Sequence, residues 1–128
     1  MGTDEQNHLI VGGDLNLKSA DPVDILIGLL NRSSCAVQVA AILVDNYGIH
    51  QWGWNNMGFD GMGQCAERHC LSRANPKRLS ESTLYVAAKR RRNGRVVTAR
   101  PCLKCAQIVC KVGRTVYRDS NGEWKRYV

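Results

Sequence analysis

The sequence lacks the segments that direct a chain to a membrane or out of the cytosol. Residues 1–6 are polar and acidic, and they are not followed by an apolar segment typical of a signal peptide. Gln6 stands where N-myristoylation requires serine or threonine. Apolar runs long enough to span a bilayer are also missing. We therefore expect a cytoplasmic protein without a membrane partner.

The sequence also lacks any sign of the oxidising compartment that disulfide bonds require. Its six cysteines could form a disulfide framework, but a chain of 128 residues is large enough for a hydrophobic core without one. Internal repeats and low-complexity segments are missing. We expect a flexible, polar N-terminal arm over residues 1–20 and a single domain over residues 21–128.

Acidic residues are few relative to basic ones. The chain has 18 lysines and arginines against 11 acidic residues, a net charge of +7 and a pI near 9.4. Such an excess favours a polyanionic partner or a phosphorylated substrate. Much of it lies in residues 89–95 and 125–126, for which a solvated turn and a charged tail are the alternative interpretation.

The hydrophobic pattern alternates between helix and strand periodicity. Asp21-Pro22 is typical of a helix start, and Asn121-Gly122 is a strong hairpin signal. Helices are predicted over residues 22–31, 65–74 and 102–112. Strands are predicted over residues 35–44, 49–54, 83–89, 114–118 and 123–128, with a short extension at 96–98. These elements predict an α/β fold with a central mixed five-stranded sheet, helices packed on it, and an antiparallel hairpin as the last two strands.

Cys65, Cys102 and Cys105 form a pattern typical of a catalytic zinc site, which has three protein ligands and one open position. The two-residue gap between Cys102 and Cys105 lets one turn of backbone present both sulfurs to one metal. Each cysteine group is predicted to begin a helix, where the helix dipole lowers the pKa of a thiol. Glu67 lies two residues past Cys65, which suits a proton shuttle that is not itself a ligand.

Other interpretations of these cysteines remain open. A structural zinc site needs a fourth ligand, for which only His69 is near. A redox Cys-x-x-Cys pair leaves Cys65 and Glu67 unexplained. The other cysteines are predicted to be small buried apolar residues; they are Cys35, Cys70 and Cys110.

Cys65-Ala66-Glu67 and the later Pro-Cys-x-x-Cys of residues 101–105 resemble the signature of the zinc-dependent cytidine/deoxycytidylate deaminase superfamily. The resemblance covers nearly the whole chain from Asp21 and implies a cytidine deaminase-like three-layer fold. It implies Zn²⁺ held by the three cysteines, with Glu67 as the catalytic proton carrier. The form Cys-Ala-Glu-Arg resembles the cytidine branch, which implies cytosine rather than adenine as the base.

The resemblance also implies substrate contacts. Gly53-Trp54-Asn55 resembles the family's Gly-x-Asn, so Asn55 is expected to contact the sugar or the base; a turn asparagine is the alternative. The backbone N–H of Ala66 is expected to help hold the pyrimidine edge. Phe59 is expected to stack on a base, with a role as a core plug as the alternative.

Three further residues near the signature receive predicted roles. Arg68 is expected to donate to a ligand sulfur, and Pro101 to orient the second cysteine pair. Arg100 is expected at the mouth of the pocket, where it meets a phosphate; an exposed, salt-bridging arginine is the alternative. The glutamate that follows Gly-x-Asn in free-cytidine deaminases is missing, since residues 56–58 read Asn-Met-Gly. This departure weighs against a plain nucleoside substrate.

The predicted function is hydrolytic conversion of cytosine to uracil in a free (deoxy)cytidine nucleotide or nucleoside, with release of ammonia. One alternative is deamination of cytosine or adenine in single-stranded DNA or RNA, favoured by the charge and by candidate stacking residues Trp52, Trp54, Phe59 and Trp124. A second alternative is a non-catalytic, zinc-stabilised interaction module. The presence of Glu67 argues against it, because a structural zinc site does not require an acid beside the metal. The sequence leaves the oligomeric state open, and a homo-oligomer is one option because relatives often share active sites between subunits.

Overall fold

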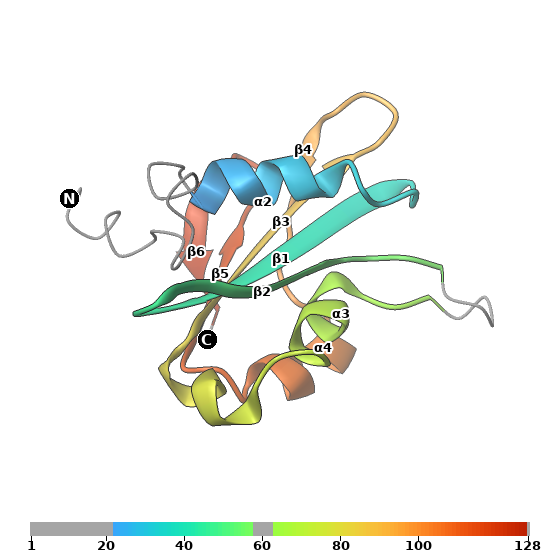
Figure 1. Ribbon diagram of the computed structural model, residues 1–128. Helices are drawn as coiled ribbons and strands as arrows, with labels where there is room; N and C mark the ends of the chain where they lie inside the picture. The colour runs from blue at the N-terminus through green and yellow to red at the C-terminus, as the bar shows by residue number, and fades with distance from the viewer. Residues whose placement is uncertain (1–21, 58–62, 128) are drawn as a thin grey trace.

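A mixed sheet forms the middle layer of the computed structural model, which describes residues 22–57 and 63–127 (Figure 1). Its strands run in the order β2-β1-β3-β5-β6, and the short β4 pairs with β3. β3 and β5 are parallel, whereas the pairs β1–β2, β1–β3, β3–β4 and β5–β6 are antiparallel. The strand bounds are β1 (Val37–Asp45), β2 (Gly48–Trp54), β3 (Thr83–Arg90), β4 (Val96–Val97), β5 (Arg114–Arg118) and β6 (Trp124–Arg126).

Helices cover both faces of this sheet (Figure 1). Helix α2 (Pro22–Leu30) lies on one face, and α3 (Ala66–Leu71) and α4 (Leu103–Val109) lie on the other. A 3₁₀ helix, η1 (Pro76–Glu81), leads from α3 into β3. Among the described helices, none has the length and apolar character needed to cross a membrane.

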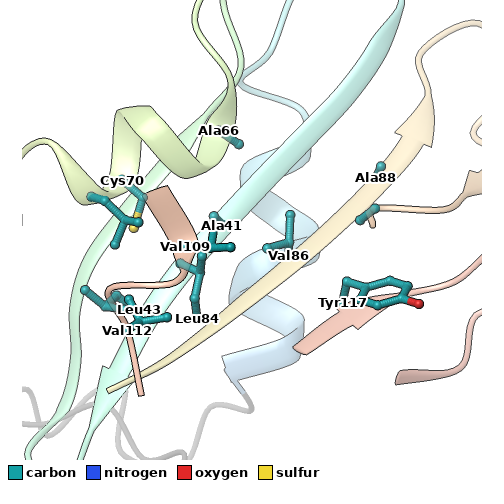
Figure 2. Packing of buried hydrophobic residues seen from close by; sticks show 12 residues of the cluster. Ala41, Leu43, Ala66, Cys70, Leu84, Val86, Ala88, Val109, Val112 and Tyr117 are labelled. Atoms are coloured by element: carbon teal, nitrogen blue, oxygen red, sulfur yellow. The ribbon is translucent and has the colours of Figure 1, made fainter. Parts of the chain in front are cut away.

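Strand β1 is buried on both faces because it lies between the two helical layers. Ala41 and Leu43 belong to the hydrophobic cluster under α3 and α4 (Figure 2). The alternate residues Ala40, Ile42 and Val44 belong to the cluster under α2. A strand with two buried faces loses the alternation of polar and apolar residues. The continuous apolar run in the sequence is therefore explained.

The predicted α/β architecture is confirmed, including the antiparallel hairpin of β5 and β6. The predicted extension at residues 96–98 forms β4, a two-residue strand that adds to the predicted five. Helices α3 and α4 end earlier than predicted, at Leu71 and Val109. After α3, the Asn75 side chain accepts a hydrogen bond from the Lys77 N–H and starts η1, which the sequence analysis missed. The predicted arm at residues 1–20 lies outside the described residues.

Backbone contact sets the distance between β2 and α3. A Cβ atom placed on Gly53 would lie 2.5 Å from the Cys70 nitrogen and 3.0 Å from its Cα. The strand therefore packs against the helix backbone directly, which only glycine permits. Because Cys65 and Glu67 lie at the start of the same helix, this contact also places them relative to the sheet.

We expect Gly53→Ala to destabilise the fold, because the added methyl group must push α3 away from β2. Overpacking of this kind costs about 1–3 kcal/mol. Gly28→Ala is the matched control, since nothing lies within 4 Å of a Cβ at that helical position; it should raise stability by about 0.5–1 kcal/mol. Urea unfolding of both variants measures the difference, and equal stabilities would contradict the contact at Gly53.

A charged cluster joins η1 to the β1–β2 hairpin. Arg78 donates two hydrogen bonds to the Asp45 carboxylate, at 2.7 and 2.8 Å, and lowers the pKa of that carboxyl. His50 Nε2 lies 2.9 Å from Ser82 Oγ and 3.7 Å from Asp45 Oδ2. Burial lowers the pKa of His50, so the ring is neutral near neutral pH.

Arg78→Ala should destabilise the protein by about 1–2 kcal/mol at neutral pH, because Asp45 stays largely buried while Arg78 is partly exposed. The lowered pKa of Asp45 contributes stability above its ordinary value of 3.8, and this contribution disappears as the pH falls. The variant should therefore unfold at a higher pH during acid titration followed by circular dichroism. Lys125→Ala, which removes the more exposed Lys125–Asp119 pair, should have a smaller effect.

Candidate active site

Two of the signature cysteines stand at helix starts, as predicted. Cys65 is the N-cap of α3, and its sulfur accepts a hydrogen bond from the Arg68 N–H at 3.3 Å. Cys102 is the N-cap of α4. Interaction with the backbone N–H of Cys105 is the main cause that lowers the pKa of the Cys102 thiol. The start of α4 therefore favours thiolate at Cys102.

The start of α3 and the first turn of α4 bring Cys65, Cys105 and Glu67 together. The two sulfurs are 2.8 Å apart, and both lie within 4.8 Å of each other and of a Glu67 carboxylate oxygen. Glu67 is only 4% exposed, and burial raises the pKa of its carboxyl. Cys102 lines the same pocket but lies outside this tight cluster.

The donor set fits a zinc ion. Burial is the main cause that raises the pKa of the Cys105 thiol, followed by the hydrogen bond with Cys65 and by charge repulsion from Glu67 and Cys65. A bound dication reverses that preference and deprotonates coordinating thiols. In the part of the chain that the structure describes, Glu67 has no ion-pair partner. Cys65, Cys102 and Cys105 would hold Zn²⁺, with Glu67 beside it.

The other three cysteines differ from one another. Cys70 is fully buried under the sheet, and burial raises the pKa of its thiol to about 12, so it is a core residue as predicted. Cys110 is exposed and donates to the Gln107 carbonyl at 3.0 Å, so the prediction of a buried Cys110 is wrong. Cys35 is half-buried and lines the pocket. Cys110 follows the end of α4, whose solvent-facing side the sequence pattern did not reveal.

A pocket of about 400 Å³ contains the cysteine cluster. Its wall includes the predicted residues Cys65, Ala66, Glu67, Arg68, Cys102, Cys105 and Asn55. It also includes residues that the sequence analysis did not assign to it, such as Cys35, Val39 and Lys104. Lys104 lies inside the Cys-x-x-Cys motif, so its position at the pocket could have been inferred. Cys35 and Val39 reach the pocket only because β1 starts beside it.

Asn55 lines the pocket while it holds two strands together. Its Oδ1 accepts hydrogen bonds from Ser33 Oγ at 2.6 Å and from the Val39 N–H at 2.9 Å. Its Nδ2 donates to the Val37 carbonyl at 2.8 Å. Both lone pairs of Oδ1 are therefore used, and the second N–H of the amide is the group left for a substrate. The predicted substrate contact of Asn55 stays a prediction.

The lip of the pocket is closed at its base by a β-bridge. Asn56 and Gln64 exchange backbone hydrogen bonds at 3.0 and 2.7 Å, and Gly63 donates to the Met57 carbonyl at 2.7 Å. Asn56, Met57, Gly63 and Gln64 all line the pocket, and these four residues form its lip. Phe59, the predicted stacking residue, lies outside the described residues.

Arg100 is directed to a different surface. Its Nη1 donates to the Tyr117 hydroxyl at 3.3 Å, and its guanidinium lies 5.0 Å from the centre of the Tyr127 ring. Arg100 is not among the described residues that line the pocket. Its predicted contact with a phosphate is therefore without geometric support. Pro101, which follows it, is buried next to Cys102, and its predicted role in orienting the second cysteine pair stays a prediction.

His69 braces α3 rather than binding the metal cluster. Its Nδ1 lies 3.1 Å from the Trp54 nitrogen and 3.0 Å from the Trp54 carbonyl oxygen. The two rings pack edge to face at 5.0 Å. His69 is also absent from the described groups that could hold a metal ion. His69 therefore does not supply the fourth ligand that a closed structural zinc site needs.

Comparison with known proteins agrees with this geometry. The model of the cytidine and deoxycytidylate deaminase zinc-binding region matches residues 25–118. The chain belongs to this family. The family is a zinc-binding one, and the cluster of Cys65, Glu67 and Cys105 is compatible with its metal. The predicted superfamily and the predicted zinc cofactor are thereby confirmed.

Solved structures include one with the same fold. The crystal structure of cytidine deaminase from Burkholderia pseudomallei is similar to 81% of this chain and 87% of its own, with a TM-score of 0.62 and 20% sequence identity. At that identity the similarity concerns the fold alone. A search of curated proteins found no match.

Zinc content tests the ligand set. The purified protein should hold about one zinc ion per chain, and Cys65→Ala, Cys102→Ala or Cys105→Ala should each lose it on dialysis. Cys110→Ala is the matched control and should keep the ion, because that cysteine is exposed and outside the pocket. If Cys102→Ala keeps zinc and Glu67→Gln loses it, the third ligand is Glu67 and not Cys102.

Proposed function

We propose that this protein is a zinc-dependent hydrolytic deaminase that converts cytosine to uracil and releases ammonia. The observation that carries the proposal is a buried carboxyl, Glu67, held against Cys65 and Cys105 in a pocket of about 400 Å³. A structural zinc site gains nothing from such an acid, whereas hydrolysis requires a group that moves protons. Membership of the deaminase family supports the same reaction.

Zn²⁺, held by Cys65, Cys102 and Cys105, would supply Lewis-acid chemistry that activates a water molecule for attack on carbon at neutral pH. Glu67 receives the proton that this water loses. The same carboxyl delivers this proton to N3 of the ring, takes a second proton from the hydroxyl group added at C4, and delivers that proton to the departing amino group. Cytosine and water thus become uracil and ammonia, and Glu67 returns to its starting state.

The environment of Glu67 suits this repeated transfer. Burial raises the pKa of the carboxyl and so brings it closer to the working pH. Ala66 is fully buried at the first position of α3, where the N–H has no intrahelical partner. That N–H is available to the pyrimidine edge. Cytosine is proposed over adenine because Cys-Ala-Glu-Arg resembles the cytidine branch.

The reaction involves only the cytosine ring, so a nucleoside, a nucleotide and a nucleic acid that contain cytosine are all candidate substrates. A free (deoxy)cytidine nucleotide or nucleoside is supported by the family and by the pocket volume. A cytosine in single-stranded DNA or RNA is supported by the net charge of +7. Contacts between the substrate and protein groups outside the pocket determine which of these substrates is preferred.

Ammonia release tests the reaction. Deoxycytidine, deoxycytidylate, an adenine nucleotide and a cytosine-containing single strand are each incubated with the zinc-loaded protein. Glu67→Gln should lower kcat on the cytosine substrates by about 10²–10⁴-fold, because the proton carrier is lost, while zinc stays bound. Glu81→Gln, at an exposed acid outside the pocket, should match the wild type. Absence of Glu67-dependent turnover on every substrate would support the non-catalytic module instead.

A further inference from the structure

Exposed arginines gather on one edge of the molecule, at the turn between β3 and β4. Arg90, Arg91, Arg92 and Arg95 are all exposed there, and the turn is closed by hydrogen bonds between the backbones of Arg90 and Arg95 and of Gly94 and Arg90. We call these four residues the arginine surface. In Figure 1 this turn projects beyond the sheet, at the end where β1 begins.

The arginine surface adjoins the wall of the pocket. The Arg91 N–H donates to the Ala36 carbonyl at 2.9 Å, and its Nη1 donates to the Ser34 carbonyl at 3.3 Å. Those two residues flank Cys35, which lines the pocket. The turn and the pocket are therefore joined through a single short segment of chain.

The sheet register gives the same relation. Arg90 pairs with Val37 on β1, and Val39, which lines the pocket, lies two residues further along that strand. Two residues of strand span about 7 Å. A phosphate next to a cytosine in the pocket would also meet Lys104, which is exposed and lines the same pocket. Cations therefore lie both in the pocket wall and on the adjacent edge.

The positive charge of this surface is not neutralised by neighbouring carboxylates. Within residues 22–57 and 63–127, the ion pairs involve His50, Arg78 and Lys125, and none involves an arginine of this surface. Asp45 ends β1 and Glu81 precedes β3, at the opposite end of these strands. Unpaired cations on one edge are the electrostatic signature of phosphate-backbone binding.

Apolar side chains are exposed beside the same pocket. Leu103, between two predicted zinc ligands, is 88% exposed, and Met57 on the lip is 58% exposed. Both can contact nucleobases that are not stacked in a duplex. A free mononucleotide has neither flanking bases nor a further backbone to occupy these groups.

We propose that the arginine surface binds the sugar–phosphate backbone of single-stranded nucleic acid, while the flanking bases contact Leu103 and Met57 and one cytosine enters the pocket. This assignment rests on the proposed deaminase function and names its substrate class. Backbone contacts supply affinity without sequence preference, and the pocket selects the base.

Strand binding is measured separately from turnover, by fluorescence anisotropy of a labelled cytosine-containing oligonucleotide in the Glu67→Gln background at 50–200 mM salt. Arg92→Glu with Arg95→Glu should weaken binding at least about tenfold at the lowest salt. Single-stranded ligands contribute a slope of about 0.7 per phosphate contact. Loss of two contacts should therefore reduce the slope of log K against log salt by about 1.4.

Lys111→Glu with Arg114→Glu is the matched control, since it makes the same change in net charge. Both residues are exposed, and Arg114 pairs with Thr83 at the opposite end of β3 from Arg90. This variant should bind the strand within about twofold of the parent. An equal loss in the two variants would reduce the effect to net charge and overturn the proposal. So would unchanged binding in the first variant, or equal affinity for a duplex of the same sequence.

Leu103→Asn tests the apolar contact. It should weaken strand binding and leave the salt slope unchanged, because no phosphate contact is lost. If it instead splits an oligomer in light scattering without changing strand affinity, Leu103 belongs to an interface between copies and that part of the proposal is wrong. Turnover of deoxycytidine with no strand binding would overturn this inference alone. Strand binding without any turnover would overturn only the deaminase function.

Discussion

Close packing of α3 against the sheet is the constraint on which the site depends. At this interface Gly53 on β2 meets the backbone at Cys70, and the small residues Ala41 of β1 and Ala66 of α3 belong to the same hydrophobic cluster as Cys70. Small side chains let a helix approach a sheet closely, and the position of the helix start is then fixed by the whole interface. Cys65 and Glu67, at the start of α3, are therefore positioned more precisely than residues on loops would be.

A buried acid next to two sulfurs is unfavourable without compensation. Glu67 and Cys105 both have raised pKa values because burial disfavours their charged forms. A bound dication would restore the charge balance, and α3 and α4 are anchored by their own apolar faces. The same burial that destabilises the ionised Glu67 keeps its proton transferable, so stability and chemistry depend on one feature of the environment.

The pocket also depends on side-chain hydrogen bonds at one end of the sheet. Asn55 connects β2 to the first residues of β1, and Arg91 connects the β3–β4 turn to the segment before β1. These hydrogen bonds fix three chain segments around one opening. The groups that are proposed to bind a substrate outside the pocket are therefore held by the same framework that forms its wall, and the arginine surface keeps a fixed position relative to the cysteine cluster.

The sequence by itself determined the element order, the buried character of β1 and the hairpin of β5 and β6, because each depends on local patterns of periodicity and turn residues. The spacing of Cys102 and Cys105 and the position of Glu67 two residues after Cys65 predicted the zinc ligands and the proton carrier, and these assignments stay predictions. Only the tertiary structure decided that Cys35 and Val39 line the pocket, that Arg100 points to Tyr117 and Tyr127, and that Cys110 is exposed. These outcomes depend on which segments meet in space, and contacts between residues distant in the chain leave no periodic trace in the sequence.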